Sequence, residues 1–158
     1  MRYLITPLIL SLLLVGCTTT ESAEIETSSL TLTAEGPLFE GNNTATLEWS
    51  PDNSFWGENK PENLKSAKVR LIDITLLSDD AAIKDVTIQF AGEKTGMQKI
   101  AFMDASGSVN IADKQENLAS FFQDNFSTIV ADFDLSEDYY DDLKIEVKII
   151  FQMEFTTN

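Results

Sequence analysis

The clearest pattern in the chain is a strict alternation of apolar and polar residues near its C-terminus, in the segment LKIEVKIIFQMEF. Lysine, glutamate and glutamine occupy one set of positions, with Ile150 as the apolar exception. Because successive side chains of a strand point to opposite faces, this period of two predicts one long, half-buried β-strand. The residues expected to share its buried face are Leu143, Ile145, Val147, Ile149, Phe151, Met153 and Phe155.

Shorter alternating segments, separated by turn-forming residues, precede this strand. They begin near Ser28, Thr44 and Lys68, and another spans 127–135 with its inward positions at Ile129, Ala131, Phe133 and Leu135. The segment 86–102 is typical of a hairpin around a Gly-containing loop, and 105–112 of a turn followed by a short strand. Together these segments predict a mainly β fold, an antiparallel β-sandwich of about seven to nine strands.

One segment has helical rather than strand spacing. Asp113 and Glu116 stand at capping-box spacing, and Leu118, Phe121 and Phe122 follow at positions i, i+3 and i+4. This predicts a single short helix at about residues 113–124. We expect its aromatic residues to plug an open end of the sandwich rather than to bind a ligand.

The N-terminal segment has a different character. Arg2 is followed by an apolar run over residues 3–16, interrupted only by Thr6, Pro7 and Ser11. As a helix this run would span about 21 Å, which is short of the ~30 Å hydrocarbon core of a bilayer. Its length and its charged start are typical of a signal peptide, which we assign to residues 1–16.

The end of this run, Leu14-Val15-Gly16-Cys17, resembles the lipobox of bacterial lipoproteins. The resemblance implies recognition of Leu14, Val15 and Gly16 by the signal peptidase, cleavage before Cys17, and attachment of diacylglycerol to the Cys17 sulfur. Two or more acyl chains anchor a protein stably where a single chain does not. In bacteria with two membranes, Thr18 in place of an aspartate favours the outer membrane. The alternative is a buried structural cysteine.

Residues 17–27, CTTTESAEIET, are rich in Thr, Ser and Glu, and Ile25 is their only large aliphatic residue. Such a segment buries too little apolar surface to offset the entropy lost on ordering. We therefore predict a flexible acidic tether at 17–27, followed by one β domain at 28–158.

The composition narrows the function. The chain has 26 acidic and 11 basic residues, a net charge of −15, which repels nucleic-acid phosphates, so no nucleic-acid partner is expected. It has no histidine and one cysteine, which excludes Ser-His-Asp catalysis, imidazole zinc ligands, thiolate metal cages and an intrachain disulfide. We expect no enzyme activity, no metal and no cofactor.

A loop-like segment rich in Pro, Asn, Asp and Gly, residues 49–63, contains Trp49, Phe55 and Trp56. Aromatic rings beside polar residues are typical of sugar- or peptide-binding surfaces, so these three residues are candidate ligand-binding residues. The alternative is that Trp49 ends a strand in the core while Phe55 and Trp56 fold back over it as a lid.

The acidic segment 132–143, DFDLSEDYYDDL, raises the question of a calcium site. An EF-hand loop starting at Asp132 would need Gly at its sixth and Glu at its twelfth position, where this chain has Glu137 and Leu143. We therefore interpret the segment as two outward-facing strand residues, Asp132 and Asp134, followed by a solvated acidic turn. A calcium site of another type is the alternative; a glycosidase carboxylate pair would need an apolar cleft.

These features predict a lipid-anchored protein of a bacterial cell envelope that acts as a non-catalytic interaction module, bound to the membrane through its N-terminal anchor. We expect a protein partner, bound through strand edges or through the aromatic loop. One alternative is a module that binds a glycan or small ligand through Phe55 and Trp56. Another is a lipid-handling sandwich with a cavity lined by Phe151, Met153 and Phe155.

Overall fold

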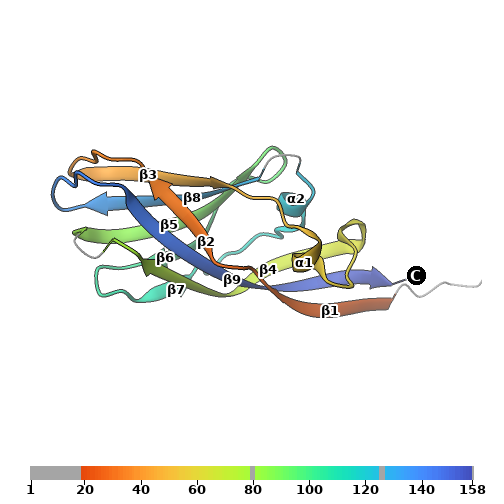
Figure 1. The fold of residues 1–158 in the computed structure, drawn as a ribbon. Helices are drawn as coiled ribbons and strands as arrows, with labels where there is room; N and C mark the ends of the chain where they lie inside the picture. Colours follow the sequence, from red (N-terminus) through yellow and green to blue (C-terminus); the bar gives the residue numbers. More distant parts are fainter. Residues whose placement is uncertain (1–18, 79–80, 125–126, 158) are drawn as a thin grey trace, which may run out of the picture.

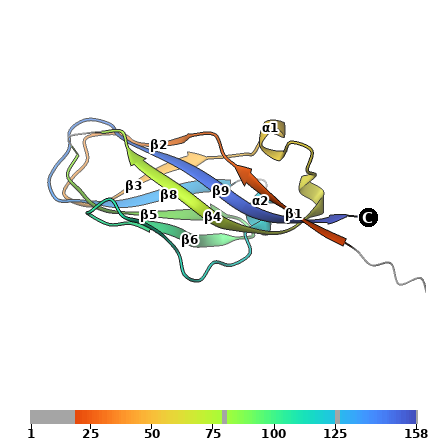
Figure 2. The same ribbon diagram turned by 90° about the horizontal axis from the view of Figure 1, so that it is seen from below.

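The computed structural model describes residues 19–78, 81–124 and 127–157. Over these residues the chain is mainly β, with nine antiparallel strands in one curled, sandwich-like sheet (Figures 1 and 2). The predicted fold class is confirmed. The predicted lipobox, Leu14 to Cys17, lies outside the described residues.

The strands differ widely in length, and the longest is the last. They are β1 (Thr19–Glu26), β2 (Leu30–Ala34), β3 (Gly41–Glu48), β4 (Leu64–Leu76), β5 (Ile83–Gly92), β6 (Gly96–Met103), β7 (Val109–Ile111), β8 (Ser127–Leu135) and β9 (Leu143–Thr157). The helical segments are short, namely α1 (Asn53–Trp56), the 3-10 helix η1 (Pro61–Asn63) and α2 (Ala119–Phe122). In the part of the chain described, no helix is both long and apolar enough to cross a membrane.

Strand β9 organises the sheet. The order along the sheet is β1-β9-β2-β3-β8-β5-β6-β7, and β4 also pairs with β9. One edge of β9 pairs first with β2 and then with β1, while its other edge pairs with β4 over most of its length. The sheet curls so that β4 comes close to β7.

The alternation that predicts β9 is realised in the core. Its odd-numbered residues from Leu143 to Phe155 are all buried, while the residues between them lie at the surface or half-buried. The apolar exception, Ile150, is half-buried on the outer face and stands opposite the exposed Leu71 of β4. The inward positions predicted for β8 are likewise buried.

The prediction of a flexible tether at 17–27 is wrong for the residues described. Thr19–Glu26 form β1, which pairs in register with β9 from Thr157 to Ile150. Most side chains of β1 are exposed, so its sequence lacks an apolar pattern, but its backbone groups satisfy the edge of β9. Ile25 supplies the buried contact, at 7% exposure, so residues 19–27 belong to the β domain that the sequence predicts to start at Ser28.

The helix predicted at 113–124 is present but much shorter than expected. It is α2, which covers only Ala119–Phe122. The segment before it is held against β4 by two side-chain amides. Gln115 accepts a hydrogen bond from the Val69 N–H and donates to the Val69 carbonyl, at 2.8 and 2.9 Å. Asn117 likewise accepts from the Ala67 N–H. These bonds take the place of the expected capping box.

Candidate functional site

The aromatic loop and α2 meet at one end of the sheet and form a single cluster of rings. Trp49, directly after β3, packs edge-on against Phe55 with centroids 5.3 Å apart, and Phe55 packs edge-on against Trp56 at 5.1 Å. The cluster continues into the core through Phe122 and Phe151, whose centroids are 5.1 Å apart. The structure thus brings the three candidate ligand-binding residues together.

Helix α1 positions Phe55 and Trp56. The Asp52 carboxylate caps the helix by accepting hydrogen bonds from the Phe55 N–H at 3.0 Å and from the Ser54 hydroxyl at 2.6 Å. These bonds, the Ser54 bond first, lower the pKa of Asp52. This capped helical turn lies within the segment 49–63, for which the sequence predicts a loop. It directs the rings of Phe55 and Trp56 back towards the sheet.

The burial of these rings matches the arrangement in which the loop folds back as a lid. Trp56 is 7% exposed, while Trp49 and Phe55 are half-buried and pack against the core. Trp56 thus presents little surface to a ligand. Trp49 retains the accessible surface that a binding site would need.

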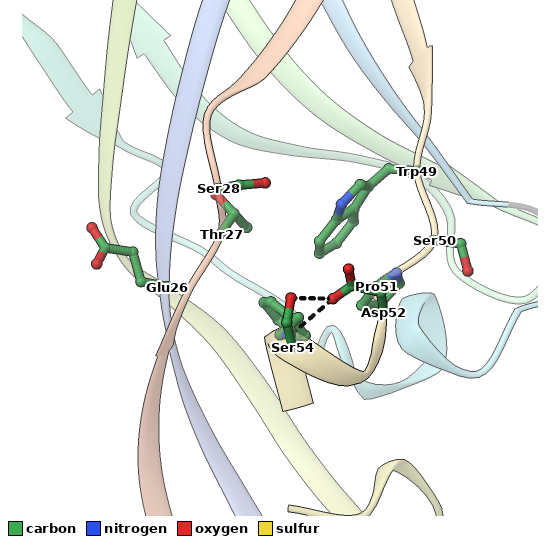
Figure 3. Close-up of a pocket in the computed structure, with 9 residues that line it drawn as sticks. Glu26, Thr27, Ser28, Trp49, Ser50, Pro51, Asp52 and Ser54 are labelled. Atoms are coloured by element: carbon green, nitrogen blue, oxygen red, sulfur yellow. Dashed lines mark hydrogen bonds between the residues drawn. The ribbon is translucent and has the colours of Figure 1, made fainter. Parts of the chain in front are cut away.

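A pocket of about 150 Å³ lies beside Trp49, between the β1–β2 connection and the segment 49–55 (Figure 3). The indole nitrogen of Trp49 faces Thr27 and Ser28, whereas the Glu26 side chain points away from the ring. The lining is mostly polar and consists of Glu26, Thr27, Ser28, Trp49, Ser50, Pro51, Asp52, Ser54 and Phe55. Such a pocket offers an aromatic surface, an N–H donor and hydroxyl groups to a small polar ligand.

A second hollow shares Trp49, Ser50 and Pro51 with this pocket and encloses about 230 Å³. Its other lining residues include Trp56, Phe121 and Phe122 of the ring cluster. Trp49 therefore borders both hollows, which makes it the most informative position for a binding experiment.

Sequence reasoning missed the residues from β1 and its connection to β2. Thr27 is 3% exposed, and its hydroxyl accepts a hydrogen bond from the Ile149 N–H at 3.0 Å. Glu26 forms an ion pair with Lys148 at 2.7 Å, which raises the pKa of Lys148. No apolar periodicity in 17–27 could have revealed this side of the pocket, because its order comes from backbone pairing with β9.

The acidic segment 132–143 is arranged as a strand end and a turn. Asp132 and Asp134 lie on the outer face of β8, as predicted, where Asp132 accepts a hydrogen bond from Thr44 at 2.7 Å and Asp134 pairs with Lys84 at 3.3 Å. Across residues 19–78, 81–124 and 127–157, no group of three acidic or thiol side chains is placed to hold a metal ion.

For Trp56→Ala we expect the free energy of unfolding to fall by about 3 kcal/mol, because a nearly buried indole leaves a cavity. Urea unfolding followed by circular dichroism measures the loss. The matched control is Trp56→Phe, which keeps a ring in the cluster and should cost less than half as much. A variant as stable as the parent protein would contradict the assignment of Trp56 to the core.

Comparison with known proteins identifies no relative of this chain. A scan against protein-family models finds no match, and searches of curated proteins and of solved structures find no significant similarity. The function is therefore argued from the residues and their arrangement.

Proposed function

We propose that this chain is a lipid-anchored protein of a bacterial cell envelope whose β domain is a non-catalytic binding module. The observation that carries the proposal is the lipobox-like Leu14-Val15-Gly16-Cys17 at the end of a short apolar run. With Thr18 after the cysteine, we favour the outer membrane.

The position of β1 supports one orientation of the domain on the membrane. Thr19 is two residues from Cys17, a distance that a fully extended chain covers in about 7 Å. An acylated Cys17 would therefore hold the β1 end of the sheet against the lipid headgroups. The opposite end of the molecule, where the β2–β3 and β8–β9 loops lie, would point away from the membrane (Figure 1).

The side-chain arrangement favours binding over catalysis. The described residues Asp52, Asp132 and Asp134 each hold a hydroxyl group or an ammonium group at the surface. General acid catalysis by a carboxyl group requires a raised pKa in an apolar pocket, and the pKa of Asp52 is lowered instead.

Membrane extraction tests the anchor. We expect the native protein to stay in the membrane pellet through washes with high salt and alkaline carbonate, and to be released by detergent, because acyl chains and not charges hold it. Immunoblotting of each fraction measures the distribution. Release by salt alone would show an electrostatic association and contradict the proposal.

A second candidate function, binding of a single sugar ring, is favoured by the pocket beside Trp49. Its volume of about 150 Å³ is below the ~300–1,000 Å³ of most ligand pockets, so it suits one small polar ring. The Ser28 hydroxyl and the Trp49 indole N–H face the same space (Figure 3). A sugar offers hydroxyl groups to both and an apolar face to the indole ring.

An oligosaccharide array tests this candidate. We expect specific retention of the native protein, and about a tenfold loss for Trp49→Phe, which keeps an aromatic ring in the cluster but removes the indole N–H. Trp56→Phe is the matched control and should be retained normally, because Trp56 does not line this pocket. Equal retention of both variants, or none of the native protein, would contradict sugar binding here.

The packing of β9 supports a filled core rather than a lipid cavity. Phe151 and Met153 are completely buried and Phe155 is 4% exposed. Phe151 alone has four aromatic neighbours, the rings of Trp49, Phe55, Phe90 and Phe122, with centroids 5.1 to 6.5 Å away. This packing counts against a lipid cavity lined by these three residues.

A further inference from the structure

Two loops at the end of the molecule opposite to Thr19 and Thr157 are joined into one unit, which we call the distal tip: residues 35–40 and 136–142 (Figures 1 and 2). Leu38 and Tyr139 exchange two backbone hydrogen bonds, at 2.7 and 2.9 Å. Asp138 accepts a hydrogen bond from the Glu40 N–H at 2.9 Å. The two loops are thus held together by hydrogen bonds.

Gly36 shows how closely the two loops approach. A Cβ atom at this position would lie 2.6 Å from the backbone oxygen of Asp141, so a larger residue would force the loops apart. The Gly36 N–H also donates to the Asp142 carboxylate at 3.1 Å. The distal tip is therefore preorganised, and a partner would not have to order it on binding.

Two large aromatic side chains stand on the outside of this unit. Leu38 is buried and Tyr139 half-buried, whereas the residue that follows each of them, Phe39 and Tyr140, is exposed. Phe39 is 62% exposed and Tyr140 is 74% exposed. Neither ring is part of the hydrophobic core. Aromatic residues are enriched in binding interfaces.

All charged residues within these two loops have the same sign. The two loops contain six acidic residues and no lysine or arginine. The acidic residues are Glu35, Glu40, Glu137, Asp138, Asp141 and Asp142. A partner that covers the two rings must therefore bring positive charge into contact with the carboxylates.

We propose that the distal tip is a docking surface for an arginine-bearing face of another protein. The planar guanidinium group is the side chain that both stacks on an aromatic ring and pairs with a carboxylate, whereas lysine offers a strongly hydrated point charge. The inference rests on the proposed binding-module function and assigns its surface and the chemistry of its partner. A membrane-anchored β1 end leaves this surface facing outwards.

Binding of two fluorescent peptides to the full-length protein in detergent micelles tests the proposal. One peptide alternates glycine with arginine, and the other has lysine in place of arginine at equal charge. We expect the arginine peptide to bind severalfold more tightly, as measured by fluorescence anisotropy at ~0.15 M salt. Equal affinities, or no binding of the arginine peptide, would overturn the proposal.

Variants separate the two contributions. Phe39→Ala combined with Tyr140→Ala should weaken the arginine peptide about tenfold and change the lysine peptide little, because only guanidinium loses its stacking surface. Glu137→Gln combined with Asp141→Asn should weaken both peptides, since it removes charge without removing the hydrogen bonds of Asp138 and Asp142. If the variant that lacks both aromatic rings bound the arginine peptide as tightly as the native protein, charge attraction alone would explain the binding. That result would overturn the proposal.

The matched control replaces two exposed apolar residues elsewhere, Leu71→Ala with Met97→Ala, which are 48% and 65% exposed. Neither peptide should bind this variant differently. A Tyr140-dependent dimer of the protein alone, seen by analytical ultracentrifugation, would show that a second copy occupies the tip and would also overturn the proposal. The peptide measurement does not depend on acylation of Cys17, so failure of the anchor and failure of the tip are distinguishable.

Discussion

Phe151→Ala is expected to lower the free energy of unfolding by about 4–5 kcal/mol, the largest stability loss of any single truncation proposed for this protein. Phe151 is completely buried near the middle of β9, which pairs with three other strands. Its ring joins the rings of the aromatic loop to those of α2, so the cavity left by alanine cannot collapse easily. A loss of this size is a large part of the ~5–15 kcal/mol that stabilises a typical domain.

Denaturant unfolding at equilibrium measures this effect, and Phe39→Ala is its matched control. The same atoms are removed from a ring that is 62% exposed on the distal tip, so the cost should stay within about 0.5 kcal/mol. Similar losses in both variants would contradict the division into a packed core and an exposed docking surface. A small loss in Phe151→Ala would instead favour a cavity able to hold lipid.

The proposed anchor predicts that Cys17→Ser abolishes lipidation. The serine hydroxyl does not replace the thiol as the acceptor of diacylglycerol, so metabolic labelling with a clickable palmitate analogue should fall to background. The variant should also retain residues 1–16, because it lacks the cysteine of the lipobox-like motif at which cleavage is expected. Each buried methylene of an acyl chain contributes about 0.8 kcal/mol to membrane binding, so under the proposal a variant without acyl chains should leave the membrane fraction.

Thr18→Ser is the matched control for this experiment. It introduces the same residue one position later, leaves Leu14 to Cys17 unchanged, and should be labelled and processed like the native protein. Labelling that persists in Cys17→Ser would place the acyl chain on another residue. Labelling that is lost in both variants would point to a general defect of secretion rather than to the thiol.

The sequence predicts the elements whose order comes from side-chain burial. Alternation specifies β9 and β8, because every second residue of these strands must enter the core. It fails for β1, whose side chains are mostly exposed and whose order comes from backbone pairing with an edge of β9. A polar strand of this kind leaves no periodic signal for sequence analysis to detect.

The helix at 113–124 illustrates a second limit. The spacing of Leu118, Phe121 and Phe122 correctly indicates a helical turn that carries rings into the core. Its start is misplaced because Gln115 and Asn117 bond to the backbone of β4, a strand distant in sequence. Here side-chain amides bond to a strand backbone as a neighbouring strand would. Such bonds can be recognised only when the positions of both segments in the fold are known.

The candidate site was predicted in part. The sequence singled out Trp49, Phe55 and Trp56, and the structure brings them together, yet it buries Trp56 and leaves Trp49 beside a pocket. The sequence does not indicate a binding surface at Phe39 and Tyr140, because the two residues lie in separate acidic loops that are far apart along the chain. Their relation appears only when the loops 35–40 and 136–142 are joined.

The most direct test of the lipid-anchored assignment is the mass of the N-terminal peptide of the detergent-extracted protein, released by cleavage after Glu21. We predict a peptide that begins at Cys17 and carries a diacylglycerol group on its sulfur. A peptide that still contains Gly16 next to an unmodified Cys17 would contradict the anchor and, with it, the orientation that directs the distal tip away from the membrane.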